Sequence, residues 1–134
     1  MAVPLSPYIV FNVLISNSDD HLRNHGFLHP GPGGWRLAPA YDLNPVPVDI
    51  KPRVLATAIN LDDGTASLDL AMDVAGYFGL KAGEARAITG EVGRAVAGWR
   101  REARRHGLPT REIDRVATAF EHADLNVARR TRQR

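Results

Sequence analysis

The alternation of apolar and polar positions divides the chain into an apolar start, a polar stretch rich in turn-forming residues and a largely helical second half. Residues 8–15 are almost wholly apolar, a pattern that fits a buried helix and a buried strand equally well, although the prolines before them favour a helix. Residues 17–25 are dense in Asp, Asn and His, side chains that bond nearby backbone groups in turns. We therefore expect a loop directly after the apolar segment.

Two short apolar stretches predict a β-hairpin after this loop. Phe27-Leu28 and Trp35-Arg36-Leu37 flank residues 29–34, a segment rich in Gly and Pro that is typical of a turn. This glycine-rich stretch lacks the Lys and the helix start of a phosphate-binding loop, so a hairpin turn is the better interpretation. Residues 40–45 leave the second strand, and we expect a further short strand at residues 54–59.

Helical periodicity runs through the second half of the chain. Ser67 is placed to cap a first helix that ends at Gly79. A longer helix is predicted from Ala82 to a stop at Gly107, and a third begins at Thr110. The apolar positions of these helices, spaced three or four apart, are Leu70, Ala71, Val74 and Phe78, then Ala85, Ile88, Val92, Val96, Trp99 and Ala103, and finally Ile113, Val116, Ala117 and Phe120. Residues 129–134 lose this periodicity and are expected to form a disordered basic tail.

Length and composition indicate one compact domain, which we place at residues 1–128. The chain has 134 residues, of which 44% are hydrophobic, and its 17 basic and 15 acidic residues give a formal charge of only +2. The high isoelectric point therefore reflects arginine content, and direct nucleic-acid binding is not expected. The absence of Cys excludes disulfides and thiolate metal sites, and no apolar run approaches the ~20 residues of a membrane span. We expect a cytoplasmic α+β protein, mainly helical, with no membrane partner.

The polar loop and the segment after the hairpin contain residues suited to phosphoryl transfer. This reaction needs a carboxylate to orient or deprotonate the attacking hydroxyl, together with hard oxygen ligands for magnesium. Asp19, Asn24 five residues later, and the distant Asp42 supply such a set, and protein kinases use the same interval and order. Asp20 stands four residues before Asn24, so it is the less suitable base.

The wider sequence resembles the signature of the HipA-like kinases, the toxin components of bacterial toxin–antitoxin pairs. The resemblance is carried by Asn-Ser-Asp-Asp-His-Leu-Arg-Asn-His-Gly-Phe, a turn, and then Trp-Arg-Leu-Ala-Pro-Ala-Tyr-Asp-Leu-Asn-Pro. The Asp-x-His-x-x-Asn core is also similar to the catalytic loop of phosphoinositide-type lipid kinases, and the later helices are similar to the family's helical C-terminal part. The resemblance implies a fold like a kinase C-terminal lobe, whose hairpin carries a metal-binding Asp.

The resemblance also implies an activity and a role for each site residue. The activity would be ATP-dependent phosphorylation of Ser or Thr on a protein substrate, with Mg²⁺ and ATP as cofactors. Asp19 would be the catalytic base, Asn24 and Asp42 the magnesium ligands, and His21 a loop-ordering residue close to the phosphates. Arg23 has two interpretations: it neutralises phosphate charge, or it pairs with the aspartate that follows the base.

Three other interpretations of the loop remain open at this point. Its carboxylates can accept backbone N–H groups in a simple network of caps and turns. His21, His25 and His29 recur every four residues, a spacing that would align three zinc ligands on a helix, although Gly26 and Pro30 argue against a continuous helix. A metal-dependent phosphohydrolase would use the Asp and His residues directly.

The resemblance covers the C-terminal portion of such a kinase and not its ATP-holding lobe. That lobe uses a glycine-rich segment and a strand Lys that precede the catalytic loop. Only 18 residues precede Asp19, and the sole lysines, Lys51 and Lys81, follow it. We therefore expect the isolated chain to be inactive. The alternative function is a non-catalytic interaction module that binds an antitoxin or a complementary N-terminal lobe.

Overall fold

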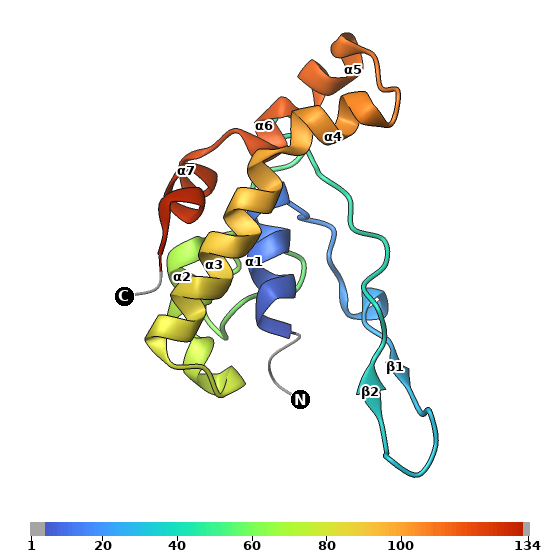
Figure 1. Ribbon diagram of the computed structural model, residues 1–134, viewed down its shortest axis with the longest axis vertical. Coiled ribbons are helices and arrows are strands. Elements are labelled where there is room, and N and C mark those ends of the chain that lie inside the picture. The colour runs from blue at the N-terminus through green and yellow to red at the C-terminus, as the bar shows by residue number, and fades with distance from the viewer. Residues whose placement is uncertain (1–4, 133–134) are drawn as a thin grey trace.

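The computed structural model describes residues 5–132, which fold mainly into helices with one small β-hairpin (Figure 1). The α-helices are α1 (Leu5–Ile15), α2 (Leu68–Asp73), α3 (Ala82–Ala97), α4 (Trp99–Arg105), α5 (Thr110–Arg115), α6 (Ala117–Phe120) and α7 (Ala123–Arg130). Two 3-10 helices, η1 (Leu22–Asn24) and η2 (Ala75–Phe78), and two strands, β1 (Phe27–Leu28) and β2 (Arg36–Leu37), complete the regular structure of this part of the chain. The predicted α+β class, mainly helical, is confirmed.

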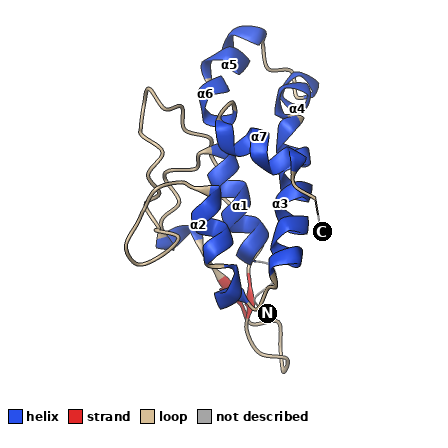
Figure 2. Cartoon of the chain, turned by 90° about the vertical axis from the view of Figure 1, so that its left-hand side faces the viewer, coloured by secondary structure: helices blue, strands red, loops and turns tan. Residues whose placement is uncertain are grey.

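Helix α1 lies inside the helical body, between α2 and α3 (Figure 2). A helix that is apolar on all sides must be buried on all sides, and α1 separates two apolar clusters accordingly. The larger cluster joins α1 to α2, α3 and α7 through Val10, Leu14, Ile15, Leu68, Ala71, Val96, Leu125 and Ala128. The smaller one contains Val13, Leu55 and Ala66. Burial on both sides resolves the ambiguity between helix and strand in favour of a helix.

Helices α3 and α7 pack at very short range because glycine stands on the contact face of α3. A Cβ atom added to Gly93 would lie 2.5 Å from the carbonyl carbon of Ala128, and one added to Gly90 would overlap the carbonyl oxygen of Thr131. The predicted disordered tail was wrong in part, since α7 includes Arg129 and Arg130. Gln133 and Arg134 lie outside the described residues.

The three predicted helices of the second half are present but interrupted. The first breaks at Val74 between α2 and η2, the second at Gly98 between α3 and α4, and the third at Val116 between α5 and α6. Glycine and β-branched residues have low helix propensity, which explains why the breaks occur there. The break at Gly98 accompanies the stacking of Trp99 on Phe120, whose ring centroids are 4.3 Å apart.

The hairpin is confirmed, whereas the strand expected at residues 54–59 is wrong. Strands β1 and β2 pair in antiparallel fashion and project away from the helices (Figure 1). Near residue 54 the structure contains only an isolated bridge between Val54 and Thr65. The bridge itself is made by the amide of Leu55, which donates to the carbonyl of Gly64, and by that of Ala66, which donates to the carbonyl of Arg53. No ladder extends from it because the next amide, that of Ala56, donates to the carbonyl of Ser18. Across residues 5–132, no helix has the length and apolar character needed to cross a membrane.

Candidate functional site

The loop that carries the predicted site begins where α1 ends. Ser16 adopts a left-handed backbone conformation with φ of 56°, and the amide of Asn17 donates to the carbonyl of Asn12 at 2.9 Å, which closes the helix. The Ser16 hydroxyl then donates to the carbonyl of Ala119 in α6 at 2.7 Å. Residues 16–18 are buried, so the start of the loop is fixed by the helical core.

Residues far along the chain hold the same end of α1. The Arg53 guanidinium donates to Ser16 Oγ at 3.0 Å and to the carbonyl of Val13 at 2.9 Å, and it pairs with Asp124 at 3.3 Å. His122 Nε2 bonds the carbonyl of Leu14 at 2.9 Å, while its Nδ1 accepts from a backbone amide of α7. Burial, followed by the nearby Arg53 charge, lowers the pKa of His122, so the neutral ring that this pattern requires is favoured.

The two adjacent aspartates of the loop have opposite environments. Asp20 is only 6% exposed, and it accepts hydrogen bonds from the hydroxyl of Tyr8 at 2.7 Å and from Asn12 Nδ2 at 3.2 Å. His25 Nε2 lies 3.7 Å from the same carboxylate. Burial and the bond to Asp20 raise the pKa of Tyr8 to about 12, which keeps its hydroxyl a donor. The side chain of Asp19 is 68% exposed, so it is the carboxylate that an external hydroxyl can reach.

The structure brings Asn24 and Asp42 together across 18 residues of sequence. Asn24 Nδ2 donates to Asp42 Oδ2 at 2.9 Å, and Asn24 Oδ1 accepts from the backbone amide of His21 at 3.1 Å. Asp42 has φ of 57°, a left-handed conformation that Asp tolerates better than most residues, and Asn44 Nδ2 holds its other oxygen at 2.7 Å. The carboxylate of Asp42 is therefore oriented from both sides.

The remaining predicted residues lie around this pair. His21 precedes η1, and its Nδ1 atom is buried without a hydrogen-bond partner among the described residues. Arg23 is exposed, and its backbone carbonyl accepts from the hydroxyl of Tyr41 at 2.8 Å. The partners of the Asp20 carboxylate are Tyr8, Asn12 and His25, so the ion pair considered for Arg23 with this aspartate is not formed.

Sequence reasoning missed Lys51, which reaches the loop from the segment after Asp42. Its Nζ atom donates to the carbonyl of Ser18 at 3.3 Å and lies 4.0 Å from Asp19 Oδ1. The contact joins residues 32 positions apart, and no local pattern around Lys51 signals it. The loop therefore has a lysine beside the candidate base in addition to the residues found by motif.

The donor set of Asn24 and Asp42 fits a magnesium ion, because both side chains offer hard oxygen atoms and stand in direct contact. To act as a ligand, Asn24 would turn its amide so that oxygen replaces the N–H that now faces the carboxylate. Within residues 5–132, no three His, Asp or Glu side chains gather as a metal-binding group. The histidines of the zinc alternative have different neighbours, since His25 packs on Tyr8 and His29 on Trp35.

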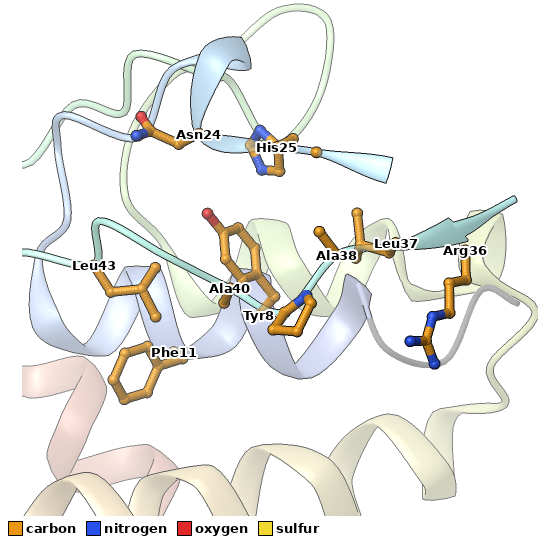
Figure 3. A pocket seen from close by; sticks show the side chains of 11 residues that line it. Tyr8, Phe11, Asn24, His25, Arg36, Leu37, Ala38, Ala40 and Leu43 are labelled. Atoms are coloured by element: carbon orange, nitrogen blue, oxygen red, sulfur yellow. The ribbon is translucent and has the colours of Figure 1, made fainter. Parts of the chain in front are cut away.

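An apolar cavity of about 570 Å³ lies between the hairpin and α1, and Asn24 is one of the residues that line it. Tyr8 and Phe11 line it from α1, while Asn24 and His25 lie on the opposite side (Figure 3). A second cavity of about 420 Å³ adjoins it and shares three lining residues, among them Tyr8 and Leu37. The hairpin thus covers one side of the loop and leaves the two cavities between itself and α1 open.

Comparison with known proteins identifies one family. The family model described as HipA-like C-terminal domain matches residues 4–99, which is more than half of the chain and includes the loop, the hairpin and Asp42. A search of curated proteins and a search of solved structures each found no match.

Proposed function

Since the chain belongs to the family of HipA-like C-terminal domains, we propose that residues 16–44 form the base and metal-ligand half of a serine/threonine protein kinase site. The observation that carries this proposal is the contact between Asn24 Nδ2 and Asp42 Oδ2 at 2.9 Å, formed by the same loop that exposes Asp19. Phosphoryl transfer from ATP uses an amide and a carboxylate to hold magnesium and a second, accessible carboxylate to receive the proton.

Asp19 accepts the proton of the substrate hydroxyl in this proposal. Its exposure gives a protein Ser or Thr access, while the bonds of Asp20 to α1 hold the preceding backbone in place. Asp20 thus acts in positioning and not as the base, since its oxygens are already taken by Tyr8 and Asn12. The two carboxylates divide the tasks of orientation and proton acceptance.

Asn24 and Asp42 would hold magnesium, which when bound supplies positive charge for the phosphates of ATP. The bond from Asn44 fixes one oxygen of Asp42 and leaves the other directed to Asn24. Arg23 extends into solvent, so its guanidinium would contact phosphate oxygens, whereas the unbonded Nδ1 atom of His21 is buried at the start of η1, which suits the loop-ordering role.

The ATP-holding groups are proposed to come from a complementary N-terminal lobe. The residues before Asp19 include neither a glycine-rich loop nor a lysine, so we propose that the 134-residue chain alone is inactive. The protein substrate, the cytoplasmic setting and the toxin role belong to the same proposal, and they are supported by family membership alone.

A magnesium titration monitored by NMR tests the metal site. The amide signals of Asn24 and Asp42 should shift together with one saturable binding curve. Asp42→Asn should abolish the response, because it removes the carboxylate while Asn tolerates the left-handed backbone. The matched control is Asp49→Asn, which removes the same charge from an exposed position in the same segment. If Asp42→Asn responds as the wild type does, or if the shifts lie elsewhere, the proposed site is wrong.

A second candidate function, an interaction module that binds an antitoxin or a complementary lobe, is favoured by the hairpin. Phe27 and Trp35 are each 62% exposed, and Leu28 is also exposed. Monomeric proteins seldom expose several large apolar side chains on one small element. This surface and the adjoining cavities suit an apolar partner whether or not phosphate is transferred.

A further inference from the structure

Lys51 has no role in the site derived from the motif, yet it contacts the candidate base. We propose that Lys51 is a phosphate-binding residue of this site, whose ammonium group contacts the transferred phosphoryl group while Asp19 holds the acceptor hydroxyl. The inference rests on the proposed function, which it deepens by adding a residue that the sequence motif does not contain.

The position of the Lys51 ammonium carries the inference. It lies 4.0 Å from Asp19 Oδ1 and donates to the carbonyl of Ser18 at 3.3 Å, while 45% of the side chain remains exposed. An ion pair this open to solvent contributes little to folding. The three donors of an ammonium group exceed the two acceptors present, so Lys51 retains the capacity to bind an anion that approaches Asp19.

The backbone around Lys51 is fixed on both sides by the loop itself. The amide of Val46 donates to the carbonyl of Ser16 at 3.2 Å, and that of Ala56 donates to the carbonyl of Ser18 at 3.3 Å. Between these anchors, the amide of Lys51 bonds the carbonyl of the buried Pro47 at 3.2 Å, which closes a turn. The segment that follows Asp42 therefore crosses the loop, and its anchored backbone fixes the position of Lys51 beside the loop.

The chemistry of the proposed reaction calls for positive charge at this point. The acceptor hydroxyl gives its proton to Asp19, its oxygen forms a bond to the γ-phosphorus of a nucleoside triphosphate, and the bond to the β-phosphate oxygen breaks to release the diphosphate. Negative charge spreads over the phosphoryl oxygens as this happens, and a cation already in place stabilises it without reorganisation. Lys51 is the lysine of this chain that stands beside the candidate base.

Binding of inorganic tripolyphosphate with magnesium tests the assignment without requiring turnover. We expect Lys51→Gln to weaken tripolyphosphate binding about tenfold, as the loss of one charge-assisted hydrogen bond predicts. Lys51→Arg should retain most of the affinity. Lys81→Gln is the matched control, since it removes the same charge from the exposed start of α3, where only its backbone amide bonds Glu84. Isothermal titration calorimetry gives the affinities, and circular dichroism confirms that the variants are folded.

The outcomes separate this inference from the proposed function. If Asn24 and Asp42 respond to magnesium but tripolyphosphate binds Lys51→Gln as tightly as the wild type, or does not bind the wild type, the role of Lys51 is overturned and the metal site stands. If tripolyphosphate affinity depends on Lys51 while neither Asn24 nor Asp42 responds to magnesium, Lys51 is supported and the proposed metal site fails. Replacing tripolyphosphate by ATP then measures what the nucleoside adds.

Discussion

Because α3 and α7 approach closely at Gly93, one methyl group added at this position should lower the stability of the fold. A Cβ atom there would lie 2.5 Å from the carbonyl carbon of Ala128, 2.6 Å from the amide nitrogen of Arg129 and 2.7 Å from the Cβ of Ala128. Two of these atoms belong to the backbone of α7, so they cannot turn aside as a flexible side chain would. Gly93→Ala therefore forces the two helices apart.

The magnitude follows from two opposing contributions. Inserting a methyl group into a packed contact costs about 1–3 kcal/mol, and a clash with backbone atoms belongs in the upper half of that range. Alanine regains about 1 kcal/mol of helix propensity over glycine. The free energy of unfolding should therefore fall by about 1–2 kcal/mol, which lowers the melting temperature of a domain of this size by roughly 3–8 °C. Thermal and urea unfolding followed by circular dichroism measure both quantities.

Gly76→Ala is the control for this experiment. Gly76 lies in η2, it is exposed, and no heavy atom stands within 4 Å of an added Cβ. The same substitution there should leave the free energy of unfolding unchanged or slightly raised. Alanine lowers the conformational entropy of the unfolded chain, and no clash in the folded state opposes this gain. The reasoning is refuted if Gly93→Ala proves as stable as the wild type while the control behaves as expected.

Three further predictions concern activity, pH and association. The purified chain, incubated with radiolabelled ATP, magnesium and acceptor protein, should give no labelling above background; strong labelling that Asp19→Asn abolishes would contradict this. The pKa of His122 is lowered, so its unfolded form binds a proton at higher pH than its folded form, and stability should be lost as pH falls below the ordinary histidine range. Urea unfolding at about pH 7.5 and about pH 5 measures this loss of stability, which should be smaller for His122→Asn than for the wild type; Asn keeps an acceptor for the helix cap. An equal loss in the two proteins would exclude this histidine as the cause. Light scattering should detect concentration-dependent association that Trp35→Ser weakens, and a clean monomer over a wide concentration range would count against the apolar hairpin surface.

The sequence predicted those elements whose signals are local. The buried helix α1, the hairpin around a Gly-rich turn and the cap at Ser67 all depend on residues close together in the chain. Helix α7 was missed because Leu125 and Val127 are its only large apolar residues, and its burial depends on glycines of α3 some 35 positions away. The expected strand at residues 54–59 failed for a related reason, since an apolar run forms a strand only where a partner strand lies beside it.

The candidate site was likewise predicted only in part from the sequence. The spacing of Asp19, Asn24 and Asp42 identified the residues, and the structure places Asn24 and Asp42 in contact. The sequence gives no means of knowing that Asp20 is buried against Tyr8 whereas its neighbour is exposed, because both follow the same helix. The contacts of Lys51 and Arg53 with the loop could not be predicted either, since each residue lies more than 30 positions after the loop residue that it bonds.

The contacts that hold the end of α1 also define how much of the chain makes up the working domain. The family match ends at residue 99, but the anchors of this helix end come from beyond that boundary: Ala119 accepts from Ser16, His122 bonds Leu14, and Asp124 pairs with Arg53. A chain trimmed to the family boundary would keep every residue of the motif and lose the support that sets the direction of the loop. For expression and engineering, the domain that supports the loop is therefore longer than the segment that the family model matches, and it runs at least to the end of α7.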